Sequence, residues 1–139
     1  GGHTGYLSPF AFVSAVREMF DGTIVVGGGI SDGAGIAGAI AAGADFIKTS
    51  TGKTAHSASL PAARTMLEVI AASGRAVGLK PSGGIRTLAD AAGYLELADA
   101  ITGPDWARPA TFRFGASGLH QVLVDAIAGE ASGTASGSY

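Results

Sequence analysis

The chain has 139 residues, of which 47% are hydrophobic and 14% are charged, a length and composition that suit one domain with a buried core. Its formal net charge of −2 argues against electrostatic binding to nucleic acid, which requires a basic surface. The absence of cysteine excludes disulfides, thiolate nucleophiles and cysteine metal sites.

Two further classes are disfavoured by pattern rather than by totals. His3, His56 and His120 are too widely spaced to form a metal-ligand motif. The sequence shows neither a signal-peptide pattern nor a long uninterrupted apolar run. We therefore expect a soluble, cytoplasmic protein that contacts neither a membrane nor nucleic acid.

Helical and strand-like segments alternate along the chain. Ser8 and Pro9 are typical of a helix start, Gly74 of a helix end, and Thr87 of an N-cap. The predicted elements are, in chain order, a helix at 10–20, a strand at 23–26, a helix at 33–42, a strand at 45–50, a helix at 60–73, a strand at 76–80, a helix at 88–101, a strand at 111–114 and a helix at 119–128. The tail at 129–139 is rich in small residues and is expected to be flexible.

Two of the predicted helices carry apolar residues at helical spacing, which marks the face that each helix should bury. These residues are Leu60, Ala63, Leu67 and Ile70 in the first helix, and Leu88, Ala91, Leu95 and Ala98 in the second.

Strands that alternate with amphipathic helices indicate an α/β fold with a parallel sheet. One helix followed by four strand–helix units corresponds to half of a (β/α)8 barrel, so we expect residues 1–128 to form one half-barrel domain. Edge strands of such a sheet would be exposed. Copies of the chain could close one barrel, a further fragment could complete it, or the sheet could stay open. We favour a homo-oligomer that completes the barrel.

Two lysines stand at the ends of successive predicted strands. Lys48 follows Phe46 on one face of its strand, and Lys80 ends the next strand before a Pro-Ser-Gly-Gly turn. Each lysine could simply extend to solvent. Held together in a partly dry cleft, however, two ammonium groups repel, and the neutral amine becomes available as a nucleophile towards an aldehyde. We favour this reactive pair.

Glycine-rich turns follow the last two predicted strands. Gly83-Gly84 and Gly115-Ala116-Ser117 could be ordinary tight turns, or they could form paired backbone cradles for a phosphate at helix N-termini. Arg86 could add charge to such a site or pair with Asp90, which lies four residues along the same helix. We favour the phosphate site.

From Gly43 to Tyr139 the chain resembles deoxyribose-phosphate aldolases, which are class I aldolases with a (β/α)8 barrel. The resemblance rests on Asp45-Phe46-Ile47-Lys48-Thr49-Ser50-Thr51-Gly52-Lys53, on Gly78 to Thr87 and on Phe112 to Ser117. It implies reversible cleavage of 2-deoxy-D-ribose 5-phosphate to D-glyceraldehyde 3-phosphate and acetaldehyde, without cofactor or metal.

The resemblance also implies residue roles. Lys48 would form the Schiff base, Lys80 would be its neighbouring cation and proton carrier, and Tyr139 would help to move the proton at C2 of the aldehyde donor. The substrate phosphate would be surrounded by Gly52, Lys53, Gly83, Gly84, Arg86, Gly115 and Ser117. The family's aspartate from an earlier strand has no counterpart here, and Asp32 is the nearby carboxylate offered in its place.

Residues 1–44 resemble FMN-dependent nitronate monooxygenases instead. Gly1-Gly2-His3 and Gly28-Gly29-Ile30 carry this resemblance, which implies an active-site histidine and a turn that binds the flavin phosphate. Both families place Gly-Ala-Asp before a strand, here Gly43-Ala44-Asp45. The chain could therefore be a chimera, and the alternatives to an aldolase are a half-barrel scaffold with little or no activity and an FMN- or phosphate-binding barrel fragment.

Overall fold

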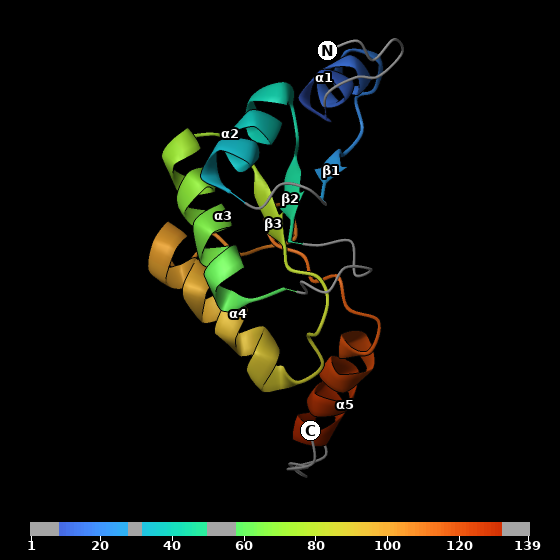
Figure 1. Cartoon of the computed structure of the whole chain (residues 1–139). Helices are drawn as coiled ribbons and strands as arrows, with labels where there is room; N and C mark the ends of the chain where they lie inside the picture. Colours follow the sequence, from blue (N-terminus) through green and yellow to red (C-terminus); the bar gives the residue numbers. More distant parts are fainter. Residues whose placement is uncertain (1–8, 28–31, 50–57, 132–139) are drawn as a thin grey trace.

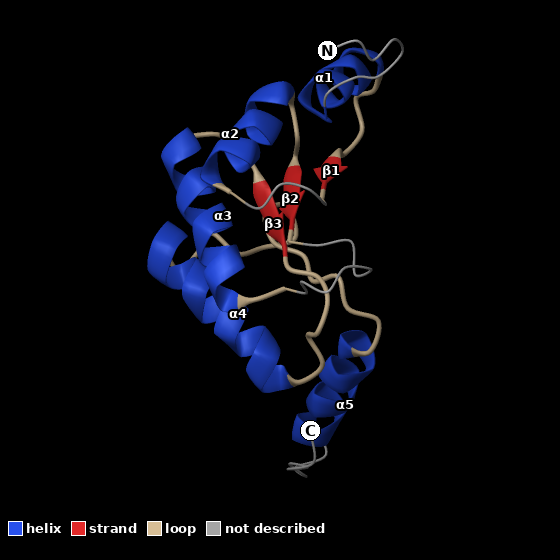
Figure 2. Ribbon diagram, in the orientation of Figure 1, coloured by secondary structure: helices blue, strands red, loops and turns tan. Residues whose placement is uncertain are grey.

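The computed structural model describes residues 9–27, 32–49 and 58–131. Three short parallel strands lie side by side in the order β1-β2-β3, and α2, α3 and α4 lie along one face of this sheet (Figures 1 and 2). The elements are α1 (Pro9–Met19), β1 (Val25–Val26), α2 (Gly33–Ala42), β2 (Phe46–Lys48), α3 (Leu60–Ser73), β3 (Gly78–Lys80), α4 (Leu88–Thr102) and α5 (Leu119–Ala131). The predicted α/β class with parallel strands is confirmed.

The main core lies between the sheet and its three covering helices. Ile47 and Leu79, which are register partners on β2 and β3, are fully buried there against Ile36 of α2 and Leu67 of α3. Because side chains alternate along a strand, the residues on either side of Ile47 and Leu79 point to the opposite face. The helices cover the face that carries Ile47 and Leu79, so a functional site would lie on the opposite face of the sheet.

The predicted fourth strand, 111–114, is a bridged segment and not a regular strand. It lies parallel to β3, where Leu79 N–H donates to the Thr111 carbonyl at 2.9 Å and Arg113 N–H donates to the Leu79 carbonyl at 3.1 Å. The pairing is interrupted, and its next bridge joins Ser82 to Gly115 beyond Pro81, which has no N–H to donate. The described sheet is open, because β1 lies at the edge opposite this segment.

Helix ends follow local chemistry closely. Gly43 ends α2 with a φ of 114°, and Gly74 ends α3 with a φ of 66°, conformations that favour glycine. Ser59 caps α3, and Thr87 caps α4 as the sequence predicts. The last helix, α5, continues to Ala131 instead of ending at 128, so the predicted tail begins later.

Two predicted core residues are largely exposed. Leu60 is 47% exposed because it begins α3, and Leu95 is 37% exposed because α4 buries Tyr94 and Leu97 instead. Spacing alone does not decide which of two overlapping apolar stripes faces the sheet. Ala63, Leu67, Ile70, Ala91 and Ala98 are buried as predicted.

Arg17 and Asp45 connect α1 and β1 to β2. The Arg17 guanidinium lies 2.8 Å from the Asp45 carboxylate and also donates to the Gly22 carbonyl at 2.6 Å. Asp45 in turn accepts the Ile24 N–H at 2.8 Å. This network fixes the start of β1 against the start of β2. No described helix combines the length and the hydrophobicity that a membrane-spanning segment requires.

The capping box of α4 supports a prediction about stability. The Asp90 carboxylate accepts the backbone N–H groups of Arg86 and Thr87, and these hydrogen bonds hold the pKa of Asp90 below its ordinary value of 3.8. A lowered folded-state pKa gives stability that is present above pH 3.8 and is lost as the pH falls through the lowered value. We therefore expect Asp90→Asn to lower the melting temperature at neutral pH and to have a smaller effect in acid.

Thermal unfolding at both pH values checks this expectation. Asp99→Asn is the matched control, because Asp99 lies on the same helix outside the capping box, and it should not lower the melting temperature at neutral pH. An equal destabilisation by Asp90→Asn at neutral and acid pH would contradict the role of its charge.

Candidate active site

Lys48 and Lys80 are direct neighbours in the sheet. They are register partners at the ends of β2 and β3, and both side chains are partly buried. The pair lies on the face opposite Ile47 and Leu79, because it alternates with these core residues. The structure thus brings together the two lysines that the sequence singles out.

Thr49 locks the two strands together immediately beyond the lysines. Its backbone N–H donates to the Lys80 carbonyl at 3.2 Å, and its hydroxyl both accepts the Ser82 N–H at 2.9 Å and donates to the Ser82 carbonyl at 3.1 Å. The Thr49 hydroxyl thus makes the hydrogen bonds to Ser82 that a backbone group of a neighbouring strand would otherwise make. The lock prevents the strand ends from sliding past one another, so it holds the two lysines at the same level.

Five of the seven predicted phosphate-binding residues line one cleft of about 540 Å³. The residues of the predicted set that line it are Gly83, Gly84, Arg86, Gly115 and Ser117. Gly83 and Gly84 have φ values of 93° and 76°, so this turn requires two consecutive residues in conformations that side chains rarely adopt. The cleft begins at Ser82, two residues beyond Lys80, and is therefore adjacent to the lysine pair.

The donors available to an anion differ from the expectation. Asp90 occupies the backbone N–H groups of Arg86 and Thr87, and Gly83 N–H donates to the Gly115 carbonyl at 3.3 Å. The N–H groups of Arg86, Thr87 and Asp90 are therefore bonded within the capping box and are not available to an anion. The backbone of Arg86, rather than its guanidinium, contacts Asp90, and the exposed guanidinium forms no ion pair within the described ranges. The cleft also contains Gly118, immediately before α5 begins.

Several predicted residues lie outside the described residues, namely His3, Gly52, Lys53, His56 and Tyr139. Asp32 is described and caps α2, where its carboxylate accepts the Gly35 N–H at 2.7 Å. Among the described residues, no three histidine, aspartate or glutamate side chains gather into a metal site.

Two further contacts on the lysine face of the sheet were not predicted from the sequence. The Arg113 guanidinium lies 4.4 Å from the centre of the Phe46 ring, on the face that carries Lys48. Gly27 follows β1 directly beside Lys48. Strand alternation placed Phe46 on the lysine face and could have placed Arg113 there too, whereas the close approach of Gly27 depends on the path of the backbone.

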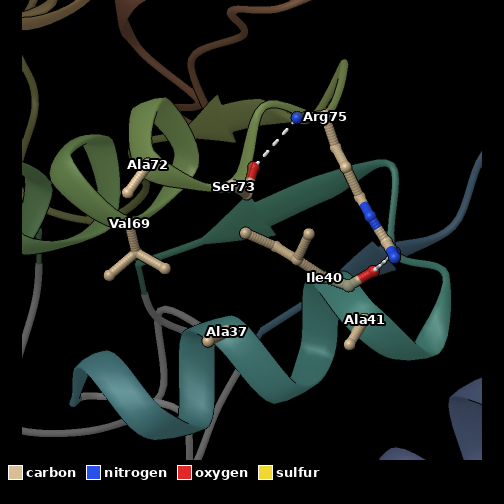
Figure 3. A pocket seen from close by; sticks show the side chains of 7 residues that line it. All are labelled: Ala37, Ile40, Ala41, Val69, Ala72, Ser73 and Arg75. Atoms are coloured by element: carbon tan, nitrogen blue, oxygen red, sulfur yellow. Dashed lines mark hydrogen bonds between the residues drawn. The ribbon is translucent and has the colours of Figure 1, made fainter.

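A second hollow, of about 280 Å³, lies between α2 and α3 at the other end of the sheet (Figure 3). Arg75 spans it by donating to the Ile40 carbonyl at 3.0 Å, and its own N–H donates to the Ser73 hydroxyl at 3.1 Å. Its remaining lining is mainly alanine and Val69, and it contains none of the predicted site residues. These contacts connect the end of α2 to the start of β3.

The sequence model of the DeoC/LacD family aldolases matches residues 30–137. The chain belongs to this family. The DeoC/LacD match begins before Gly43, where the motif resemblance begins, and therefore includes α2 as well as the lysine strands.

Individual proteins agree with the DeoC/LacD assignment. The chain is 54% identical over 101 residues to the deoxyribose-phosphate aldolase of Agrobacterium fabrum, covering 73% of this chain and 39% of that protein. A candidate deoxyribose-phosphate aldolase from Toxoplasma gondii ME49 has a TM-score of 0.72 at 26% identity, over 84% of this chain and 49% of that one. One from Coccidioides immitis has a TM-score of 0.65 at 28% identity, over 84% and 44% respectively. The chain thus spans less than half of each of these three proteins.

Proposed function

We propose that the chain carries the Schiff-base centre of a deoxyribose-phosphate aldolase, a lyase that reversibly cleaves 2-deoxy-D-ribose 5-phosphate to D-glyceraldehyde 3-phosphate and acetaldehyde. The observation that carries the proposal is the register pairing of Lys48 with Lys80 on one face of the sheet. Family membership and the 54% identity to the Agrobacterium aldolase support it.

The chemistry requires only side chains. The neutral amine of Lys48 attacks C1 of the open-chain sugar, and loss of water gives an iminium ion. The C3 hydroxyl then gives up its proton, the C2–C3 bond breaks, and its electron pair flows into the iminium to form an enamine. Release of C3 to C5 as glyceraldehyde 3-phosphate, protonation of the enamine at C2 and hydrolysis return acetaldehyde and the free amine.

Lys80 has two roles in this scheme. It is proposed to be the cation next to the Lys48 amine, since the two residues are register partners. It also carries protons during the bond-breaking steps, and Tyr139 is proposed to assist at C2. No separate cofactor or metal is part of the proposal, since the iminium ion itself accepts the electrons.

The phosphate of the sugar is proposed to bind in the cleft adjacent to the lysines. Gly83, Gly84, Gly115 and Ser117 offer backbone surface without bulky side chains, and the Arg86 guanidinium is exposed there. Gly52 and Lys53 are proposed to complete the site. Arg86 is proposed to supply the positive charge of this site.

The remaining expectations accompany this function as proposals. The partners are a small phosphorylated sugar or aldehyde, and a second copy of the chain is proposed to cover the open sheet as a homo-oligomer in the cytoplasm. The solution mass tests that assembly. A chimeric origin, a scaffold with little activity and an FMN-binding fragment stay as predictions, and none is favoured by a specific contact of the described residues.

The proposal is tested by trapping the intermediate. Incubation with acetaldehyde and borohydride should fix a two-carbon adduct on Lys48, detected by mass spectrometry of the Lys48 peptide. Absence of an adduct, or an adduct spread equally over all three lysines of the chain, would overturn the proposal.

A variant of Arg86 separates phosphate binding from imine chemistry. Arg86→Gln removes the guanidinium but keeps the backbone N–H that binds Asp90. We expect about tenfold to a hundredfold weaker capture of 2-deoxyribose 5-phosphate, since a hydrogen bond to a charged group contributes about 1.5–3 kcal/mol. Trapping of acetaldehyde, which has no phosphate, should be unchanged.

The two trapping reactions, each followed against substrate concentration, measure this difference. Arg64→Gln on the exposed face of α3 is the matched control and should alter neither reaction. A parallel loss in both reactions for Arg86→Gln would assign the residue to folding and not to phosphate binding.

A further inference from the structure

The main chain at Gly27 approaches Lys48 unusually closely. β1 pairs with β2 through Val25–Phe46 and Val26–Ile47, so the next level places Gly27 beside Lys48. A Cβ atom added to Gly27 would lie 3.0 Å from the Lys48 Cβ, 3.3 Å from its Cδ and 3.4 Å from its Cγ. Such separations are tighter than nine in ten contacts that real Cβ atoms make. The stem of Lys48 therefore packs directly against a backbone that has no side chain.

The other side of the lysine pair is confined in the same way. A Cβ atom on Gly115 would lie 3.2 Å from the Lys80 Cε and 2.7 Å from the Ser82 hydroxyl oxygen. Lys48 and Lys80 thus occupy a space bounded by a glycine on each flank. If Lys48 is displaced from its own flank, it must move towards the ammonium of Lys80 or turn away from it.

Gly27 is held in place by contacts at the opposite end of its strand. Asp45 N–H donates to the Ile24 carbonyl at 2.8 Å, and Ile24 N–H donates back to the Asp45 carboxylate at 2.8 Å. The Arg17 guanidinium fixes that carboxylate. These contacts oppose a retreat of β1 from β2, so added bulk at residue 27 would press on the Cβ of Lys48 and displace the side chain that it carries.

We propose that Gly27 is a positioning residue for Lys48, whose missing side chain sets the direction of the Lys48 amine relative to Lys80. The inference rests on the proposed function and extends it to a segment before residue 30, where the family match begins. Catalytic groups are sensitive to such placement, because a misplacement of about 1 Å can cost about a hundredfold in rate.

The test is Gly27→Ala. A shift of a few tenths of an ångström should slow acetaldehyde trapping on Lys48 about tenfold at saturating acetaldehyde, while the melting temperature stays close to that of the parent chain. Gly93→Ala is the matched control, because a Cβ there would meet its nearest neighbour, Leu60, at an ordinary 3.7 Å. It should leave trapping unchanged.

A second readout does not depend on aldolase chemistry. Reductive methylation with formaldehyde and borohydride labels accessible neutral amines, and Gly27→Ala should lower the label on Lys48 relative to that on Lys53. If the parent chain fails to trap acetaldehyde, the proposed function fails, and this labelling still decides the role of Gly27. Equal labelling and equal trapping in the parent chain and in Gly27→Ala would overturn the inference. Loss of a cooperative melt in Gly27→Ala would overturn it too, since residue 27 would then serve folding.

Discussion

Lys48→Arg should abolish the borohydride-trapped adduct and reduce aldol cleavage by about 10⁴-fold or more, the scale on which loss of a catalytic nucleophile acts. Arginine keeps the positive charge and most of the length of lysine. Its guanidinium stays protonated and cannot form an iminium ion. The expected loss is therefore chemical, and the melting temperature should change little because position 48 lies at a strand end outside the main core.

A gain-of-lysine control distinguishes reactivity from accessibility. Arg64→Lys adds an exposed lysine on α3, far along the chain from both strand ends. This new amine should be labelled by acetaldehyde and borohydride far more slowly than Lys48, because it is exposed on α3 and has no second lysine beside it. Equal labelling of Lys48→Arg and the parent chain would remove Lys48 from the reaction altogether.

Lys80→Met should have the second largest effect. Methionine has a similar length but no charge, so Lys48 would lose the neighbouring ammonium and the proposed proton carrier. We expect trapping to fall by about 10²–10⁴-fold, the range of acid–base contributions. The trapping rate of both proteins under the same conditions measures the effect.

Lys80→Arg divides the two roles of Lys80. The retained cation should preserve adduct formation on Lys48, whereas the loss of a titratable amine should slow complete turnover of 2-deoxyribose 5-phosphate. If Lys80→Met traps acetaldehyde as fast as the parent chain at neutral pH, the pairing in the sheet has no chemical role. A slow Lys80→Arg variant in both assays would indicate that shape at position 80 matters more than charge.

The helices could be predicted from sequence because their signals are local. Apolar spacing and end residues such as Gly74 and Thr87 define α3 and α4 without knowledge of their partners. The strands were harder to delimit, because a strand is defined by its neighbours. The segment at 111–114 has strand-like residues, yet its pairing with β3 is broken at Pro81.

The part of the candidate site that lies at the ends of the strands could be predicted from the sequence. The parts that depend on capping and on tertiary contacts could not. Lys48 and Lys80 are neighbours because parallel strands place their carboxyl ends at one edge, a rule that needs only the order of elements. The occupation of the Arg86 and Thr87 N–H groups by Asp90 was not foreseen, although Thr87 and Asp90 have the spacing of a capping box. The close pass of Gly27 depends on the tertiary contacts of Arg17 and Asp45.

The Thr49 hydroxyl is hydrogen-bonded to both backbone groups of Ser82 and so fixes the register of β2 against β3. A shift of this register by one residue would move each side chain to the opposite face of the sheet. Inserting one residue between Lys80 and Ser82 would turn Lys80 inward among aliphatic side chains and move Leu79 to the face that carries Lys48. Loops that join the helices to this sheet can change in length without any such exchange. In natural or engineered variants, the length of the connecting loops should therefore vary, whereas the number of residues from Phe46 to Thr49 and from Gly78 to Ser82 should stay constant.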